Sequence, residues 1–138
     1  MSFTVPNEAA TYLCDQQTAR SPTDSWQIGL YQNTPPIGAT TVLAQVTACN
    51  FAGYAPISLG SFNPSTIDAS NRAAANPVTN NFVFTRSTSG TAQAANGYYV
   101  FHAGKLVCLE AFASPFTFTN SGDALTLQFT FRTRSDPV

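Results

Sequence analysis

Few residues in this chain are suited to acid–base or nucleophilic chemistry. His102 is the only histidine, and Lys105 follows it at a predicted hairpin turn. A catalytic base needs a nucleophile and an orienting carboxylate within hydrogen-bond reach, and the sequence around His102 offers neither pattern. We therefore interpret His102 as a polar turn residue, with a catalytic base as the alternative.

The acidic residues form no recognisable constellation. Glu110 lies among apolar neighbours, so a buried acid is one interpretation. A side chain that points outward, or that pairs with an arginine at an interface, is the interpretation we favour. The aspartates are scattered singly, which argues against a carboxylate pair or a calcium loop; they are Asp15, Asp24, Asp68, Asp123 and Asp136.

The cysteines also lack a functional spacing. Cys14, Cys49 and Cys108 are odd in number and widely separated, whereas zinc sites use close pairs. We expect three free thiols. The chain has no glycine-rich phosphate loop and no nucleophile elbow. The sequence therefore predicts no catalytic, cofactor-binding or metal-binding residue, and we expect that the protein is not an enzyme.

The composition is unusual in its low charge. The chain has 138 residues, enough for one domain over residues 1–138, and 43% of them are hydrophobic. Only 9% are charged, against about 25% in typical domains. Protein interfaces are depleted in charged residues, so this composition favours a subunit of a large assembly; base composition or secretion is the alternative explanation.

The charge balance and the hydropathy exclude two classes of partner. The net charge is −1 and no basic stripe is present, so we expect no nucleic-acid binding. The N-terminus lacks the basic start and apolar run of a signal peptide, and no segment approaches about 18 apolar residues. We expect a protein that is made in a cytoplasm and is not embedded in a membrane.

The elements that must position these residues are predicted to be strands around a central hairpin, Gly97–Phe112. Tyr98–Phe101 are aromatic or β-branched, and Ala103-Gly104 suits a two-residue turn before a return strand, Leu106–Phe112. Both faces of these strands are apolar, which predicts cover from a second sheet or from another subunit.

Other short strands and one helix complete the prediction. The helical segment lies within residues 1–20 and ends before Ser21-Pro22. The further strands are Trp26–Gln32, Thr41–Cys49, Tyr54–Leu59 with Pro56 marking an edge or a bulge, Phe82–Thr85 and Leu125–Phe131. The segments 33–38, 63–81 and 87–96 are expected to be loops, the second with some edge pairing. The pattern predicts an all-β, two-sheet antiparallel sandwich, jelly-roll-like, with an immunoglobulin-like sandwich as the alternative.

The passages DSWQIGLYQNTPP and ACNFAGYAPISLG resemble a pattern found in small virion proteins of tailed bacteriophages. The matching residues are Leu30, Asn33, Phe51, Gly53, Tyr54 and Ala55, and the PNEAATYL segment also fits. The resemblance covers about the first 60 residues. The chain departs from it at Thr47–Asn50, where similar sequences often carry acidic residues.

The resemblance implies a capsid decoration or cement protein that binds the outer shell of major capsid proteins in the virion. We also expect self-association as a dimer or trimer, because a weakly charged surface with a net charge near zero promotes association.

Two alternatives to the capsid role stay open. The first is a tail-associated or carbohydrate- or receptor-binding module, which would use Trp26 and exposed tyrosines. Phe116 and Phe118 read as ordinary strand residues, with a sugar-binding platform as their alternative. The second is a small β-fold enzyme, which the missing catalytic set disfavours.

Overall fold

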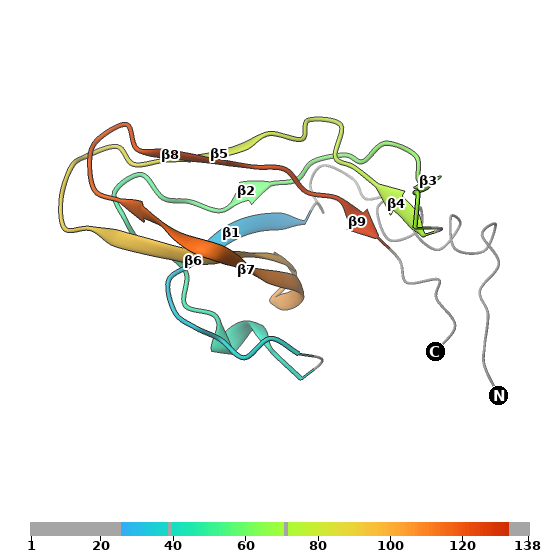
Figure 1. Cartoon of the computed structure of the whole chain (residues 1–138), viewed down its shortest axis with the longest axis horizontal. Helices are drawn as coiled ribbons and strands as arrows, with labels where there is room; N and C mark the ends of the chain where they lie inside the picture. The colour runs from blue at the N-terminus through green and yellow to red at the C-terminus, as the bar shows by residue number, and fades with distance from the viewer. Residues whose placement is uncertain (1–25, 39, 71, 133–138) are drawn as a thin grey trace. The chain divides into compact units, whose positions relative to one another are not determined.

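The computed structural model describes residues 26–38, 40–70 and 72–132. The regular structure in these ranges is almost entirely β, and every strand pairing is antiparallel (Figure 1). The helical structure described is a single 3₁₀ turn, η2, Leu43–Gln45. The predicted all-β class is therefore confirmed. The predicted helix within residues 1–20 lies outside the described residues.

The chain forms two compact units. The larger unit contains residues 26–58 and 81–127, and the described part of the smaller unit contains residues 59–80 and 128–132. Each unit holds its own sheet structure. The expectation of one domain over residues 1–138 stays a prediction.

A four-stranded sheet forms the centre of the larger unit, with strand order β2-β1-β6-β7. Its strands are β1 (Gln27–Tyr31), β2 (Ile57–Ser58), β6 (Gln93–His102) and β7 (Lys105–Phe118). The inner strands β1 and β6 carry most of the buried positions, whereas β7 is an edge strand whose residues are mostly half-buried or exposed.

The predicted central hairpin is confirmed. Ala103 and Gly104 have φ angles of 50° and 72°, the positive pair that a two-residue turn of this kind requires. Both strands extend beyond the predicted limits. β6 starts at Gln93, so the end of the expected 87–96 loop is strand, and β7 continues to Phe118.

A second, two-stranded sheet in the larger unit pairs β5 (Phe82–Thr85) with β8 (Ala124–Leu127). β5 has the predicted bounds. A series of aromatic contacts links this sheet to β7. The ring of Phe84 stacks on Tyr54, Tyr54 meets Phe51 edge-on, and Phe51 stacks on Phe118 with ring centroids 4.1 Å apart. These rings bury apolar surface between the two sheets.

The smaller unit contains a three-stranded sheet in the order β3-β4-β9, formed by Thr66–Ile67, Ala73–Ala75 and Phe131–Arg132. Ala73 and Ala75 are buried, and Phe62 and Phe131 pack against them. The expectation that residues 63–81 lack a core strand is therefore wrong. Alanines can serve as core residues here because the side chains of the neighbouring phenylalanines fill the volume that alanine leaves.

Three predicted strands differ in the structure. The alternating run Leu125–Phe131 divides into β8 and β9, because Phe129 N–H donates to Asn80 Oδ1 at 2.7 Å instead of joining a ladder. The Thr41–Cys49 strand is wrong; within it, the Val42 N–H donates to Gln45 Oε1, a local bond that stabilises η2. The Tyr54–Leu59 strand shortens to β2, which begins directly after Pro56 and lies at an edge as predicted.

Gly97 in β6 lies where a side chain has no room. A Cβ atom at this position would overlap the Tyr31 hydroxyl and the Glu110 carbonyl oxygen, on the two strands that flank β6. By contrast, a Cβ atom on Gly38 would meet no atom within 4 Å.

We predict that Gly97→Ala lowers the free energy of unfolding by roughly 1–3 kcal/mol, because overpacking forces the neighbouring strands apart. Gly38→Ala is the matched control and should leave stability unchanged or slightly raised. Urea unfolding followed by circular dichroism measures both. Equal effects of the two substitutions would contradict the close approach at Gly97.

Candidate functional site

An irregularity in β7 creates the most site-like feature of the larger unit. Ala95 pairs with Phe116, whereas Gly97 pairs with Ala111, so residues 112–115 of β7 lie opposite Asn96 alone. Pro115 lies within this bulge. Because proline has no N–H to donate to a ladder, it is tolerated in strands mainly at edges and bulges.

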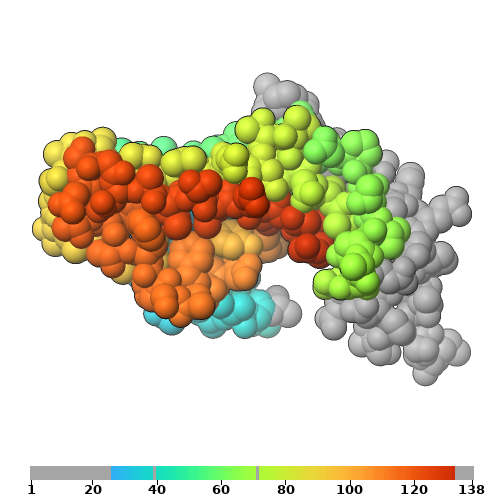
Figure 2. All heavy atoms as spheres, turned by 45° about the horizontal axis from the view of Figure 1, so that its top comes forward, coloured from blue at the N-terminus to red at the C-terminus, as the bar shows by residue number. Residues whose placement is uncertain are grey.

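The bulge forms one side of a pocket of about 270 Å³ that is partly open to solvent. The loop after β1 forms the opposite side, and Figure 2 shows the orange atoms of β7 directly beside the cyan atoms of this loop. The lining residues are uncharged; they are Tyr31, Asn33, Thr34, Pro35, Ile37, Asn96, Ala111, Phe112 and Pro115.

Two asparagines hold the loop side of the pocket in place. Asn33 Nδ2 donates to the Gln45 carbonyl at 2.8 Å, and Asn33 Oδ1 accepts from the Thr47 N–H at 3.0 Å. Asn96 Nδ2 donates to the carbonyl oxygens of Gln32 and Asn33 at 2.7 and 3.1 Å. The Asn96 bonds fasten the loop to β6 and the Asn33 bonds fasten it to residues 45–47, so the pocket wall does not depend on apolar packing alone.

Tyr31 is the buried polar member of the pocket. Its side chain is 1% exposed, and its hydroxyl has no hydrogen-bond partner among the described residues. Burial, and to a smaller extent the negative charge of Glu110, raises the pKa of Tyr31 above its ordinary value of 10.0. The phenol is therefore neutral at physiological pH.

The structure shows where the two candidate chemical residues, His102 and Glu110, lie. His102 pairs with Lys105 at the base of the hairpin turn, as expected for a turn residue. Glu110 is exposed, and its carboxylate accepts a hydrogen bond from the Tyr98 hydroxyl at 2.8 Å. The buried-acid interpretation of Glu110 is therefore wrong, and the outward-pointing interpretation is confirmed.

The two described cysteines, Cys49 and Cys108, are free thiols. Burial raises the pKa of each to about 11, so both are protonated and weakly nucleophilic at neutral pH. Cys14 lies outside the described residues. Within the described ranges, no group of three or more histidine, cysteine or acidic side chains is arranged to hold a metal ion.

The aromatic side chains do not form an exposed platform. Trp26, Tyr31 and Tyr99 are buried, so Trp26 does not offer the exposed surface that the sugar- or receptor-binding alternative assigned to it. Phe118 is buried and stacks on Phe51, and Phe116 meets it edge-on. Both phenylalanines serve as strand residues, as expected.

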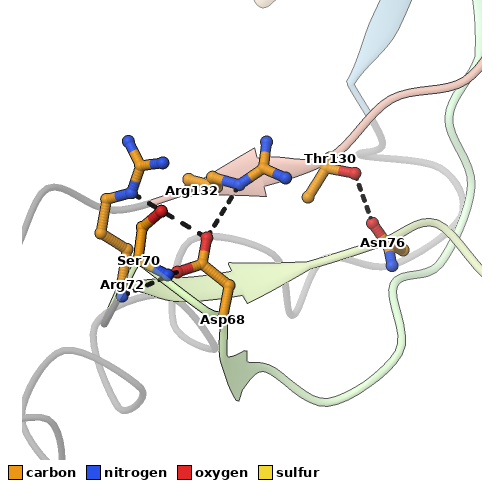
Figure 3. Close-up of polar contacts among 6 residues, drawn as sticks. All are labelled: Asp68, Ser70, Arg72, Asn76, Thr130 and Arg132. Carbon is orange, nitrogen blue, oxygen red and sulfur yellow. Dashed lines mark hydrogen bonds and ion pairs between the residues drawn. The ribbon is translucent and has the colours of Figure 1, made fainter.

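Asp68 organises a turn in the smaller unit (Figure 3). Its carboxylate accepts from the N–H groups of Ser70 and Arg72 and from Arg132 Nε, the last at 3.0 Å. The Arg72 N–H, with smaller contributions from the Arg132 side chain and the Ser70 N–H, holds the pKa of Asp68 below its ordinary value. These bonds close the β3–β4 turn and join it to β9, so we interpret the cluster as structural.

Arg86 is the one buried charged residue among those described. Its guanidinium donates to the carbonyl oxygens of Thr88, Thr91 and Phe118 at 2.7–2.9 Å. A buried charge needs such partners because it has lost its hydration shell. The fork-shaped side chain thus ties the loop after β5 to the end of β7, which is again a structural role.

The pocket is not evident from the sequence. One signal was present, because Pro115 stands in an otherwise strand-like run and indicates a bulge. The contributions of Tyr31 and Asn96 carried no signal, since an aromatic residue and an amide within strands are ordinary. Tyr31 and Asn96 line the same pocket because of the register in which β1 and β6 pair.

Comparison with known proteins identifies no relative: no family model, no curated protein and no solved structure matches this chain. In the part of the chain that the structure describes, no helix has the length and hydropathy required to span a bilayer.

We predict that Arg86→Met lowers the free energy of unfolding by roughly 2–4 kcal/mol, because three carbonyl groups, of which that of Phe118 is buried, lose their donor. Arg132→Met is the matched control. It removes an exposed guanidinium whose ion pair with Asp68 is open to solvent, so the loss should be much smaller. Thermal and urea unfolding measure both. A loss for Arg132→Met as large as that for Arg86→Met would contradict this assignment.

Proposed function

We propose that this chain is a bacteriophage virion structural protein that decorates or cements the capsid. It would bind the outer shell of major capsid proteins and have no catalytic role. Two sequence observations support the proposal, namely the resemblance over about the first 60 residues and the 9% of charged residues. Weakly charged surfaces suit subunits that are covered by neighbours.

The observation that carries the proposal is the edge strand β7. It spans 14 residues and is last in the strand order of its sheet. Several of its apolar side chains are only half-buried, among them Leu106, Val107, Leu109 and Phe112. Long apolar edges are usually blunted by charge or covered, because they template pairing with another chain. Lys105 and Glu110 are the only charges that β7 carries.

We also propose that the larger unit is a two-sheet sandwich, jelly-roll-like or immunoglobulin-like. The aromatic contacts from Phe84 through Tyr54 and Phe51 to Phe118 support it, because they join the two-stranded sheet to the four-stranded one. In this arrangement β7 would present its free edge to the shell, and attachment would occur by strand addition.

We predict that virions lacking this protein lose infectivity at a lower temperature than complete virions, and that added purified protein restores their heat resistance. Thr117→Lys, on the exposed surface of β7, should weaken rescue by at least about tenfold, because the new charge must be desolvated at the interface. Thr126→Lys, on the exposed surface of β8, is the matched control and should rescue fully.

Binding of the purified protein to the depleted capsids is measured by co-sedimentation. Equal heat resistance of depleted and complete virions would contradict cementing. Normal binding by Thr117→Lys would contradict attachment through β7.

We predict that the isolated protein is a dimer or trimer at micromolar concentration. A symmetric interface would bury the same weakly charged surface on each subunit. Light scattering measures the mass directly, against a monomer of 14.7 kDa. A monomer throughout the micromolar range would contradict self-association and leave the capsid shell as the partner that covers this surface.

A further inference from the structure

We propose that β7 pairs with β7 of a second copy of this chain, antiparallel across a two-fold axis at Cys108. This inference rests on the self-association proposed above and deepens it, because it names the surface and the register and selects a dimer over a trimer. Three features of the segment Lys105–Glu110 carry it, namely a free edge, the symmetry that a bulge gives it and the placement of its two charges.

The free edge belongs to the part of β7 next to the hairpin turn. β6 pairs with this part on one side (Figure 1), and no other strand of the described residues pairs with it on the other side. The bulge at residues 112–115, which contains Pro115, separates it from the end of β7. An uncovered edge of this kind templates pairing with another chain.

A second bulge, at Val107, makes the segment symmetric about Cys108. Cys108 pairs with Val100 of β6 and Leu106 pairs with the next residue, Phe101, so the register skips Val107. Positions along the ladder are therefore counted on β6, because the bulge adds one residue to β7 on one side of Cys108.

The two charges of β7 lie at equal distances from Cys108 on this count. The β6 partner of Lys105 is two positions to one side of the partner of Cys108, and the partner of Glu110 is two positions to the other side. Because side chains alternate along β6, these three residues lie on the same face of the sheet. Four positions of a strand span about 13 Å, so Lys105 and Glu110 cannot reach each other within one chain.

A two-fold axis at Cys108 brings these opposite charges together. Lys105 would lie opposite Glu110 of the second copy at one end of the ladder, and the same pair would recur at the other end. Leu106 and Leu109, each one position from Cys108, would face each other between them. Such directly opposite pairs interact, whereas parallel pairing in register would place Lys105 beside Lys105 of the second copy and be destabilising.

Both charged side chains are available for this contact. Lys105 and Glu110 are exposed, and neither forms an ion pair with another described residue. The Tyr98 hydroxyl bonds to one carboxylate oxygen of Glu110, which leaves the other oxygen as an acceptor. A two-fold pairing closes after two copies, so the product is a dimer in which two four-stranded sheets form one continuous sheet.

Pairing with a second copy and strand addition to the shell use the same edge of β7. Since β6 occupies the other edge, the two contacts exclude each other over residues 105–110. The dimer is therefore the form of the free protein, and it dissociates when β7 adds to the shell.

Sedimentation equilibrium of the isolated, full-length protein measures the Kd of the dimer. Lys105→Glu and Glu110→Lys each place like charges opposite each other at both ends of the ladder, so each should raise the Kd about tenfold. The double variant Lys105→Glu/Glu110→Lys restores opposite charges and should return the Kd to within about threefold of the wild type. Thr126→Glu, on the exposed surface of β8, is the matched control and should leave the Kd unchanged.

Circular dichroism checks that each variant is folded, as expected for changes of exposed side chains. A folded double variant that dimerises as weakly as the single variants would overturn the pairing of Lys105 with Glu110. An equally large effect of Thr126→Glu would overturn it as well.

Carbodiimide cross-linking tests the register in the unaltered protein. The reagent joins a carboxylate to an amine in contact with it, and Lys105 is the only lysine. We expect a species of twice the monomer mass of 14.7 kDa, with an amide bond between Lys105 and Glu110 that mass spectrometry identifies. A mixture of ¹⁴N- and ¹⁵N-labelled protein shows that the bond joins two copies. Failure to find this bond between copies would overturn the register.

The oligomeric state separates this inference from the wider proposals. A trimer, or a dimer whose Kd neither charge reversal changes, would overturn pairing through β7 and leave self-association in place. A monomer throughout the micromolar range would overturn both. All these measurements use isolated protein, so none depends on whether depleted virions keep their heat resistance.

Discussion

The close approach of Tyr31 to the backbone at Gly97 is the contact on which the larger unit and its pocket depend. Because position 97 has no side chain, both the Tyr31 ring of β1 and the Glu110 carbonyl group of β7 can approach the backbone of β6 closely. This contact therefore joins β1, β6 and β7 at one point of the sheet. The same contact buries the Tyr31 hydroxyl beside the β7 bulge. One contact therefore determines both the packing of the strands and the place of this buried hydroxyl.

Uncharged polar side chains form many of the hydrogen bonds that link distant segments of this chain. In more highly charged proteins ion pairs often have this role. Gln93 Oε1 accepts from the N–H groups of Asn50 and Phe51, and the Tyr54 hydroxyl bonds to the backbone of Leu30. Each bond replaces a ladder bond at a point where a strand has ended. Amides and phenols suit this task because they donate and accept without the desolvation cost of a charge.

Arg86 and Asp68 are each at the centre of a cluster of hydrogen bonds, the first buried and the second partly exposed. Arg86 is buried and donates to three carbonyl groups, and its charge also helps to hold the pKa of Asp123 below its ordinary value. Asp68 is bonded mainly by backbone N–H groups and by an exposed arginine. In both clusters the hydrogen bonds join segments that are separate in the sequence, so we interpret both as structural.

The sequence by itself determined the all-β class, the central hairpin and β5. Local chemistry is sufficient there, because Ala103-Gly104 permits positive φ angles and the flanking β-branched and aromatic residues favour strands. The sequence also indicated an edge at Pro56, since proline lacks the N–H that an inner strand requires.

Only the tertiary structure decided the division of Leu125–Phe131 into β8 and β9, the burial of Ala73 and Ala75, and the pocket. Each depends on a residue distant in the chain: Asn80 intercepts the Phe129 N–H, and Phe131 covers the alanines. Tyr31 and Asn96 likewise meet through pairing of strands far apart in sequence. A periodic pattern reports which face of a strand is apolar, but it carries no information about which partner will cover that face.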